Sequence, residues 1–375
     1  MRFICDRDIL NDAVNIVSKA ASVKSTISAL EGIKAQVENG HIKLSAYDFN
    51  IAICSVIEAD TVQNGTIIFP AKLFGDILRK LPAGDVYVDA DENFKISINC
   101  EGIKFDIMGV SPEDFPEIPS VSDQNRIDLE ISAFKRIVKQ TVFAASTLDI
   151  KPILTGILFE VNDSESSISA IGLDQYRLAL KKESFEYKTG DISKFIVPAK
   201  TLNELLKILP EDSDKNIQIC VAGKNVMFCY DNFVFISRTL EGDFLNYRNV
   251  IPAQSTFTVK VKTKKLRAML DRAGLITTSN AIKSPIRCDF DFDTIKISTA
   301  SNIGKFSDMI EVENFGTALT VGFNNRFMLD ALQAVDCEDI VLRMNSELTP
   351  ILIEPVEGDD FLFLVLPMRL NLNLK

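Results

Sequence analysis

The sequence predicts an α+β fold of three structurally similar repeats, each with two helices and antiparallel sheets. The first observation behind this class is a strand-to-helix segment that occurs twice and, in altered form, a third time. The second is that paired alternating strands follow each helical segment. A chain of 375 residues is long enough for two or three domains with separate cores.

The repeated segment reads IIFPAKLFGDILRKLP from Ile67, FIVPAKTLNELLKILP from Phe195 and VGFNNRFMLDALQAV from Val321. Each copy predicts a strand that feeds a helix. Pro70 and Pro198 suit a first helical turn, where the missing N–H costs nothing, and the third copy lacks this proline. On a 3.6-residue period the first copy separates its mostly basic face from an apolar face. The apolar face consists of Leu73, Phe74, Ile77, Leu78 and Leu81.

A second helical pattern starts each repeat, from Asp6, Ser132 and Lys262. Apolar residues recur in it at helical spacing, as Leu10, Val14 and Val17, as Phe134, Val138 and Thr141, and as Leu266, Leu270 and Ala273. In the second and third copies the exposed face is expected to be mostly basic. An ordinary solvated face would explain any one helix, but the repetition favours a positive surface.

Alternating strand pairs turn at Glu101-Gly102, at Asp231-Asn232 and near Glu357-Gly358. The breaks between repeats fall in segments rich in turn residues, one before Asn125 and one before Ser255. We therefore expect three domains at residues 1–124, 125–254 and 255–375.

Composition limits the function. The formal net charge of −11 argues against an evenly basic surface, although it does not report how charge is distributed. Apolar runs such as Phe361 to Leu366 are far shorter than the roughly 18 to 20 residues of a membrane span. The amino terminus carries charges where a signal peptide would be apolar, so a cytoplasmic location is expected.

The residues that usually carry chemistry are sparse. Seven cysteines without a C-x-x-C pair read as small buried hydrophobes in a reducing compartment. The one histidine, His41, sits at a hairpin-like turn and cannot alone make a metal site or a triad. Neither a phosphate-binding loop nor a G-x-G-x-x-G motif is present. We expect no catalytic residue, no metal and no cofactor.

Three aspartates, Asp289, Asp291 and Asp293, alternate in a way that suggests calcium ligands. An EF-hand loop would need glycine at Thr294 and glutamate at Ala300. A strand with one acidic face is therefore the favoured interpretation.

Four segments, taken with the threefold repeat, carry a family resemblance. They are LTGILFE from Leu154, GLDQYRLAL from Gly172, LEGDFLNYRNVIP from Leu240 and LPMRLN from Leu366. Together they resemble the bacterial DNA polymerase III beta subunits, the sliding clamps, over essentially the whole chain. The resemblance implies a head-to-tail homodimeric ring of six like domains that encircles duplex DNA, with helices lining the hole. It also implies a processivity factor without catalysis.

Helix dimensions agree with a ring of two chains. Six helices side by side would leave a hole of about 10 Å, whereas twelve would leave about 28 to 34 Å, enough for a duplex roughly 20 Å wide. A basic lining would attract phosphates without reading bases, and an acidic exterior would discourage DNA elsewhere. The candidate lining residues are Lys24, which rests on the resemblance, and Lys72, Arg79, Lys80, Lys135, Arg136, Lys139, Lys151, Lys200, Lys207, Lys264, Lys265, Arg267 and Arg326.

The resemblance also implies two protein-binding surfaces. At the dimer interface, Phe105 and Ile107 would meet Leu275 and Ile276, although core packing explains these residues nearly as well. The second surface is a pocket for short hydrophobic peptides from the replicative polymerase, the clamp loader and repair proteins. Its residues are Leu154, Leu173, Tyr176, Leu178, Leu245, Asn249, Val250, Leu364, Leu366, Pro367, Met368 and Arg369.

The sequence departs from the family pattern around this pocket. Leu173 and Gln175 flank Asp174 where the family usually has threonine and a small residue. Leu245 and Asn249 stand where proline and arginine are frequent. These changes are expected to alter peptide preference. Residues 371–375 run past the usual end of the family, and no role is assigned to them.

Two functions of other classes stay open from the residues alone. A β-rich scaffold would bind peptides but not DNA, and a strictly monomeric chain at micromolar concentration would favour it. A nuclease would use scattered acids, and metal-dependent DNA cleavage abolished by one carboxylate change would favour that function.

Overall fold

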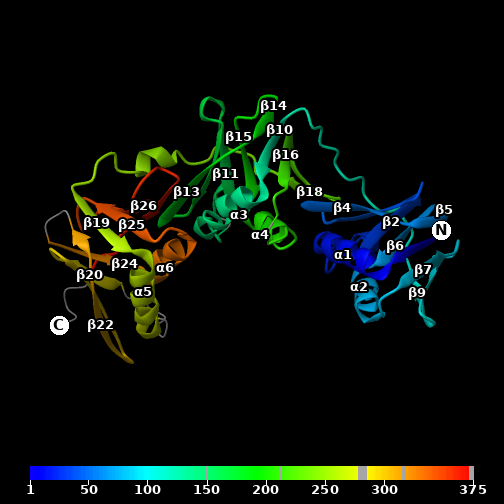
Figure 1. The fold of residues 1–375 in the computed structure, drawn as a ribbon, viewed down its shortest axis with the longest axis horizontal. Coiled ribbons are helices and arrows are strands. Elements are labelled where there is room, and N and C mark those ends of the chain that lie inside the picture. Colours follow the sequence, from blue (N-terminus) through cyan, green and yellow to red (C-terminus); the bar gives the residue numbers. More distant parts are fainter. Residues whose placement is uncertain (149, 212, 278–284, 315–317, 371–375) are drawn as a thin grey trace. The chain divides into compact units, whose positions relative to one another are not determined.

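The chain forms two compact units, whose helices and strands are drawn in Figure 1. The computed structural model describes residues 1–148, 150–211, 213–277, 285–314 and 318–370. Unit 1 consists of Met1–Ile131, Glu186–Ile192 and Asn203–Thr239. Unit 2 consists of Ser132–Phe185, Ser193–Leu202 and Leu240–Lys375.

Unit 1 contains two antiparallel sheets. Sheet A has the strand order β5-β1-β7-β8-β9, and sheet B has the order β14-β10-β16-β17-β18-β4-β3-β2-β6. The strands of sheet A are β1 (Arg2–Asp6), β5 (Asp60–Gln63), β7 (Asp85–Ala90), β8 (Lys95–Cys100) and β9 (Ile103–Met108). Those of sheet B are β2 (Gly32–Glu38), β3 (His41–Tyr47), β4 (Ile51–Glu58), β6 (Gly65–Pro70), β10 (Arg126–Glu130), β14 (Tyr187–Thr189), β16 (Asn216–Ala222), β17 (Asn225–Tyr230) and β18 (Phe233–Arg238).

The helices α1 (Arg7–Val17) and α2 (Ala71–Lys80) lie side by side in unit 1 (Figure 1). The Asp6 carboxylate caps α1 by accepting hydrogen bonds from the backbone N–H groups of Asp8 and Ile9. The predicted apolar stripe of α1 is fully buried, as are most apolar residues of α2. Leu73 is the exception, because it is 46% exposed. Pro70 ends β6 directly before α2, one residue earlier than predicted.

Unit 2 also contains two antiparallel sheets. Sheet C has the order β15-β11-β12-β13-β27-β26-β25-β19-β23, and sheet D has the order β22-β21-β20-β24. The strands of sheet C are β11 (Gly156–Asn162), β12 (Ser167–Leu173), β13 (Arg177–Ser184), β15 (Lys194–Pro198), β19 (Phe257–Lys262), β23 (Glu313–Asn314), β25 (Asp339–Met344), β26 (Ile351–Pro355) and β27 (Phe361–Val365). Those of sheet D are β20 (Ile286–Phe290), β21 (Thr294–Ser301), β22 (Gly304–Glu311) and β24 (Leu319–Phe323).

Three helices belong wholly or almost wholly to unit 2: α3 (Ile131–Lys139), α5 (Thr263–Thr277) and α6 (Asn325–Ala334). The boundary between the units runs within α4 (Ala199–Leu206). At α6 the Asn324 side chain accepts a hydrogen bond from Arg326 N at 3.0 Å, so it caps the helix where the other repeats have proline. Helices α5 and α6 pack side by side (Figure 1). In the described part of the chain, no helix is long and apolar enough to cross a membrane.

The sheets repeat a pattern of five strands and four strands. Sheet A is a five-stranded half whose equivalents are β14-β10-β16-β17-β18 in sheet B and β23-β19-β25-β26-β27 in sheet C. Sheet D is a four-stranded half whose equivalents are β6-β2-β3-β4 and β15-β11-β12-β13. Sheets B and C each join one half of either kind, through β18 against β4 and through β27 against β13. The three-repeat α+β fold is confirmed.

One strand expectation was wrong. Asp289 lies in β20, but Asp291 and Asp293 lie in the turn between β20 and β21 instead of on one strand face. Arg287 and Thr320 donate hydrogen bonds to the Asp289 carboxylate, and the latter contact is 2.6 Å long. Aspartate is frequent in turns because its carboxylate accepts hydrogen bonds from nearby backbone N–H groups. Asp291 does so with Phe292 N at 2.9 Å.

Candidate functional site

A buried apolar cluster lies where β13 and β27 join in sheet C, and we call it the unit 2 joint cluster. It consists of Leu154, Leu158, Ile171, Leu173, Leu178, Ile196, Tyr247, Leu352 and Leu364. The structure therefore brings together four of the predicted pocket residues, Leu154, Leu173, Leu178 and Leu364. Each of these four is at most 7% exposed, so they form the floor of the site.

The other predicted pocket residues are more accessible than this floor. Tyr176 is 53% exposed, Leu245 43%, Val250 42% and Leu366 37%. Asn249 and Arg369 are exposed, and Pro367 and Met368 are half-buried. Leu245 and Val250 flank the cluster residue Tyr247 in sequence, and Leu366 follows Leu364, so exposed apolar residues adjoin the buried floor. Such a combination suits a peptide with hydrophobic side chains.

The segment after β27 is held by backbone contacts. Leu366 N donates to Tyr176 O at 2.8 Å, and Met368 N donates to Gly322 O at 2.7 Å. Pro367 forms an isolated bridge with Phe323 of β24. A Cβ atom at Gly322 would stand 2.4 Å from Met368 O, so only glycine allows this close approach. These contacts fix Pro367 and Met368 beside β24 of sheet D.

Arg177 is a central residue of the site that sequence reasoning missed. Its guanidinium donates to Asp174 Oδ2 at 3.0 Å and to Asp330 Oδ2 of α6 at 2.6 Å. The guanidinium also lies over the Phe327 ring, 4.6 Å from the ring centre. Asp174 in turn accepts hydrogen bonds from the backbone N–H groups of Tyr176 and Arg177. The turn that carries Tyr176 is thereby tied to α6.

Tyr247 was also missed, although it belongs to the cluster. Its hydroxyl donates to Glu160 Oε2 at 2.8 Å, and Arg248 Nη2 donates to the same oxygen at 2.6 Å. Burial and the Glu160 carboxylate raise the pKa of the Tyr247 hydroxyl well above its usual value, so the hydroxyl stays protonated. The anchored ring holds the 3-10 helix Tyr247–Val250 on the cluster, with Leu245 and Val250 exposed beside it.

The corresponding joint of β18 and β4 in unit 1 shows which feature of the sequence could have pointed to Tyr247 and its neighbours. Its own buried cluster includes Tyr47, Ala52, Phe115 and Ile236. The segment over it reads DFPEIP from Asp114, whereas the segment in unit 2 reads DFLNYRNVIP from Asp243. The longer version carries Leu245, Tyr247 and Val250. An insertion relative to the internal repeat therefore marks the site.

The predicted DNA-facing cations of unit 1 are all exposed: Lys24, Lys72, Arg79, Lys80 and Lys207. Two of them, Lys72 and Arg79, line a cleft of about 830 Å³ together with Lys19. Some of this charge is compensated, because Arg79 pairs with Asp76 and Lys207 pairs with Glu204 at 2.8 Å. Exposed pairs of this kind remain open to exchange with phosphate oxygens.

In unit 2 most predicted cations are also exposed, namely Lys139, Lys151, Lys200, Lys264, Lys265, Arg267 and Arg326. Arg136 and Lys139 of α3 share a cleft of about 370 Å³ with Asp330 and Asp336. Arg136 binds Glu183 through two hydrogen bonds of 2.9 and 3.0 Å. Lys135 was expected on the exposed face of α3. This expectation was wrong, since Lys135 is only 6% exposed and lies on the buried side of the helix.

The residues expected at a dimer interface lie on the edge strand β9 of sheet A and near the C-terminal end of α5. In β9, Phe105 is 36% exposed and Ile107 is half-buried. Near the end of α5, Leu275 is 73% exposed and Ile276 is half-buried. Phe105 and Leu275 are thus not core residues of the single chain. Their pairing stays a prediction.

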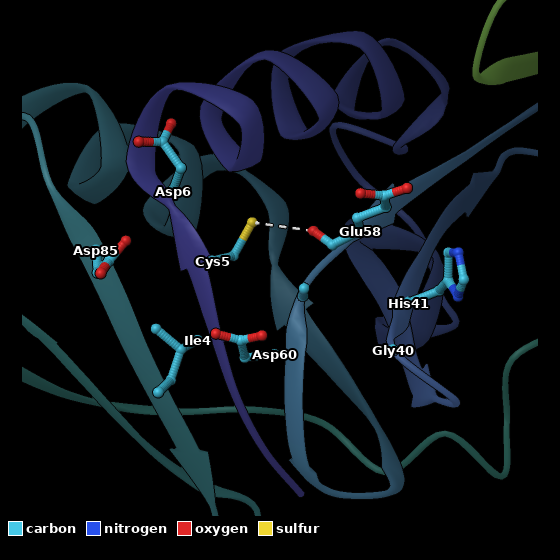
Figure 2. A pocket seen from close by; sticks show the side chains of 9 residues that line it. Ile4, Cys5, Asp6, Gly40, His41, Glu58, Asp60 and Asp85 are labelled. Carbon is cyan, nitrogen blue, oxygen red and sulfur yellow. Dashed lines mark hydrogen bonds between the residues drawn. The ribbon is translucent and has the colours of Figure 1, made fainter.

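A cavity of about 440 Å³ in unit 1 has a cysteine and the histidine of the chain, two residue types that often act in catalysis, among its lining residues (Figure 2). Cys5 and His41 both line it, but in this view His41 lies on the far side of Glu58 from Cys5. Cys5 Sγ donates to the Glu58 carbonyl, and burial raises the pKa of this thiol to about 11. A protonated thiol is a weak nucleophile. Among the residues described here, no group of three or more His, Cys, Asp or Glu side chains is placed to hold a metal ion.

Comparison with known proteins gives consistent matches along the chain. Family models of the DNA polymerase III beta subunit match in order: the N-terminal domain over residues 1–119, the central domain over 128–246 and the C-terminal domain over 248–369. The beta sliding clamp of Halalkalibacterium halodurans is 31% identical, over 98% of this chain and 100% of that protein. The beta sliding clamp of Staphylococcus epidermidis is 29% identical, over 98% of this chain and 99% of that protein.

Solved structures show the same similarity. A putative DNA polymerase III beta subunit of Eubacterium rectale aligns with a TM-score of 0.94 at 32% identity, over 98% of this chain and 100% of that one. The DNA polymerase sliding clamp of Bacillus subtilis aligns with a TM-score of 0.94 at 28% identity, over 99% of this chain and 100% of that one.

Proposed function

The chain belongs to the DNA polymerase III beta subunit family, and from this membership we propose that two copies close into a ring around duplex DNA. Its function is that of a DNA sliding clamp, which tethers the replicative polymerase and confers processivity. It is an accessory factor without catalysis of its own. The cytoplasmic location and the domain boundaries at 124/125 and 254/255 stay predictions.

One observation carries the proposed homodimer. In the described residues, sheet A is a five-stranded half and sheet D a four-stranded half, whereas sheets B and C each combine both kinds. A second copy would supply the missing half for each, through β9 against β22. Head-to-tail contacts of this type close when the rotation between copies allows it. Two copies would then contain two equivalent joints.

The proposed DNA contact uses the exposed cations of the helices. Lysine and arginine side chains on helices bind phosphates without reading the bases, so a ring lined with them can slide. With the exposed cations gathered on the lining, the acids that give the chain its formal net charge of −11 would lie mostly on other surfaces and would discourage binding of DNA there.

The proposed peptide site is the unit 2 joint cluster with its exposed rim. Its occupants would be short hydrophobic segments of the polymerase, the clamp loader and repair proteins. Met368 would act as an adaptable wall for several of them, because its thioether side chain is flexible and polarisable. Arg369 is exposed and would donate to a peptide carbonyl or carboxylate.

Replacing Met368 with alanine is expected to weaken binding of a hydrophobic polymerase peptide about 10-fold or more, because the wall loses apolar contacts. Fluorescence titration of a labelled peptide measures this. Met309→Ala, at an exposed methionine of β22, is the matched control and should leave the affinity unchanged. Equal affinities for both variants would place the peptide elsewhere.

Gly322→Ala is expected to reduce peptide binding without touching the peptide. The new Cβ would overlap Met368 O and the Leu370 side chain, so residues 366–370 must move. We expect the free energy of unfolding to fall by about 1 to 3 kcal/mol and the peptide affinity by about 10-fold. Gly75→Ala, whose Cβ would meet only ordinary contacts, is the control in the same assay and in thermal melts. A Gly322→Ala protein with unchanged peptide affinity would separate the 366–370 segment from the site.

The direct test of the function is loading on nicked circular DNA by a clamp loader, followed by gel filtration before and after linearisation. The protein should co-elute with circular DNA and be lost once the DNA has ends. Equal retention on both forms would show ordinary binding and would contradict a topological link.

A further inference from the structure

The joint of β18 and β4 in unit 1 is built like the joint that carries the proposed peptide site in unit 2. Ala52 of β4 faces Ile236 of β18, as Leu178 of β13 faces Leu364 of β27. All four side chains belong to the buried apolar clusters of their joints. Unit 1 therefore contains a second apolar floor of the same construction.

In unit 1 this floor is covered by residues 114–121, the segment after sheet A that we call the strap. Phe115 is 8% exposed and belongs to the buried cluster, and Ile118 and Val121 pack against the same cluster. These three side chains recur at every third position. A polyproline II chain has three residues per turn and would place them on one face, and the two prolines of the strap favour that conformation. The strap thus has the form of a peptide ligand with three apolar anchors.

The strap is held on the floor by side chains. Among the described residues, no backbone hydrogen bond joins residues 116–121 to another segment of the chain. The strap contains neither a helix nor a strand, and sheet B is complete without it. A segment with few contacts and no backbone hydrogen bonds opens at low cost. The strap can therefore leave the floor without breaking the sheet beneath it.

The floor in unit 1 carries a cation where the floor in unit 2 has leucine. Lys34 of β2 faces Ile68, whereas Leu158 of β11 faces Ile196. Lys34 Nζ lies 5.3 Å from the centre of the Phe115 ring, within range of a cation–π interaction. Three exposed acids stand close to this ring in the sequence, namely Glu113, Asp114 and Glu117. An aromatic anchor flanked by acids is therefore complementary to this floor in both shape and charge.

We propose that the floor over the unit 1 joint is a second docking groove, which the strap occupies as an internal ligand and which accepts acidic peptides with an aromatic anchor from other proteins once the strap is released. The comparison with unit 2 rests on the proposed peptide site, whereas the contacts of the strap do not. A tethered ligand acts at an effective concentration of the order of millimolar, so it excludes weak competitors. The chain thus has one open groove and one that its own strap closes.

The test releases the strap and offers the same sequence as a separate peptide. Phe115→Ala with Ile118→Ala removes two anchors, and the probe is a labelled synthetic peptide of residues 111–122. We expect the probe to bind this double variant about 10-fold more tightly than it binds the parent protein, as measured by fluorescence anisotropy. Phe115→Ala alone should give a smaller gain in the same direction. A probe with alanine in place of its phenylalanine is the matched control peptide and should show no gain.

A charge change locates the bound probe. Lys34→Glu, added to the double variant, should remove the gain, because the acids of the probe would then meet a like charge. A probe bound at the unit 2 joint cluster would instead ignore this change and would be lost with Met368→Ala. Val226→Ala is the matched control for lost core packing, since Val226 of β17 is fully buried and lies outside the cluster under the strap. It should bind the probe no better than the parent does, and thermal melts compare the stability of all variants.

Proteolysis shows whether the strap has left the floor. A glutamate-specific protease should cleave after Glu117 about 10-fold faster in the double variant than in the parent, because only a loosened strap fits the protease. Faster cleavage with a gain in probe binding that Lys34→Glu removes supports the groove. Unchanged cleavage, no gain in binding, or a gain that survives Lys34→Glu overturns it. None of these measurements uses DNA or the polymerase peptide, so they stand apart from a failure of the proposed clamp or of the unit 2 site.

Discussion

Replacing Phe105 with aspartate should convert the dimer into monomers. Phe105 is 36% exposed in the single chain, so the free protein tolerates a polar side chain there. In the proposed ring it would become buried against β22 of the other copy. Covering the remaining exposed third of the Phe105 side chain contributes about 0.5 to 1 kcal/mol per joint, and an unpaired carboxylate in its place adds a desolvation cost of about 1 to 3 kcal/mol. With two joints, dimerisation should weaken about 1000-fold or more.

Analytical ultracentrifugation at micromolar concentration measures this shift. Val62→Asp is the matched control, because Val62 is an exposed apolar residue on β5, at the opposite edge of sheet A. It should leave the dimer intact, and its thermal melt should match that of Phe105→Asp. A Phe105→Asp protein that still sediments as a dimer would exclude β9 from the interface. The same variant should lose its retention on circular DNA, because a ring that cannot close holds no topological link.

The second large effect is expected from reversing Lys264, Lys265 and Arg267 to glutamate together. All three are exposed on the first two turns of α5. Cations near a helix N-terminus oppose the helix dipole, so helix stability does not account for them. Their reversal should leave the fold intact or slightly stabilised. If they line the hole, binding to DNA should fall about 1000-fold at 50 mM salt, and the deficit should shrink as salt rises.

Retention on nicked circular DNA across a salt series measures the effect. A control with the same change in net charge reverses Lys43, Lys194 and Lys296, which are exposed lysines on strands. Equal losses for both triple variants would mean that only net charge matters. Unchanged retention in the α5 variant would remove these residues from the lining.

Local pattern predicted most of the fold. Helical spacing identified the first helix of each repeat, and the alternating strands and turns were found where expected. The Glu101-Gly102 turn has positive φ at both residues, as its sequence indicates for a tight hairpin. Asp291 and Asp293 were misassigned to a strand because alternation alone does not separate a strand from the turn that follows it.

Partners distant in sequence explain what was missed at the site. Arg177 looks like an ordinary strand residue until Asp330, 153 positions away, is placed beside it. Tyr247 likewise needs Glu160, 87 positions away. Lys135 was misplaced for a related reason, since helical phase within a nine-residue helix does not tell which neighbours cover its flank. That Leu154, Leu173, Leu178 and Leu364 share one buried cluster was predictable only because the family resemblance joined them across the 3-10 helix Pro152–Thr155, β12, β13 and β27. Their use as a peptide pocket stays a prediction.

The open edges of β9 and β22 also affect how the monomer behaves before it dimerises. Within the residues that the structure describes, a newly folded monomer presents two edge strands that pair on one side only, with exposed apolar side chains such as Ile103 and Met309. Such edges recruit any available strand, so the dilute monomer is the species most prone to aggregate. Lys104 and Asp106 on β9, and Lys305 and Glu311 on β22, place charges along both edges and act as gatekeepers. Expression yield in variants without these charges would therefore depend on how quickly the two copies meet.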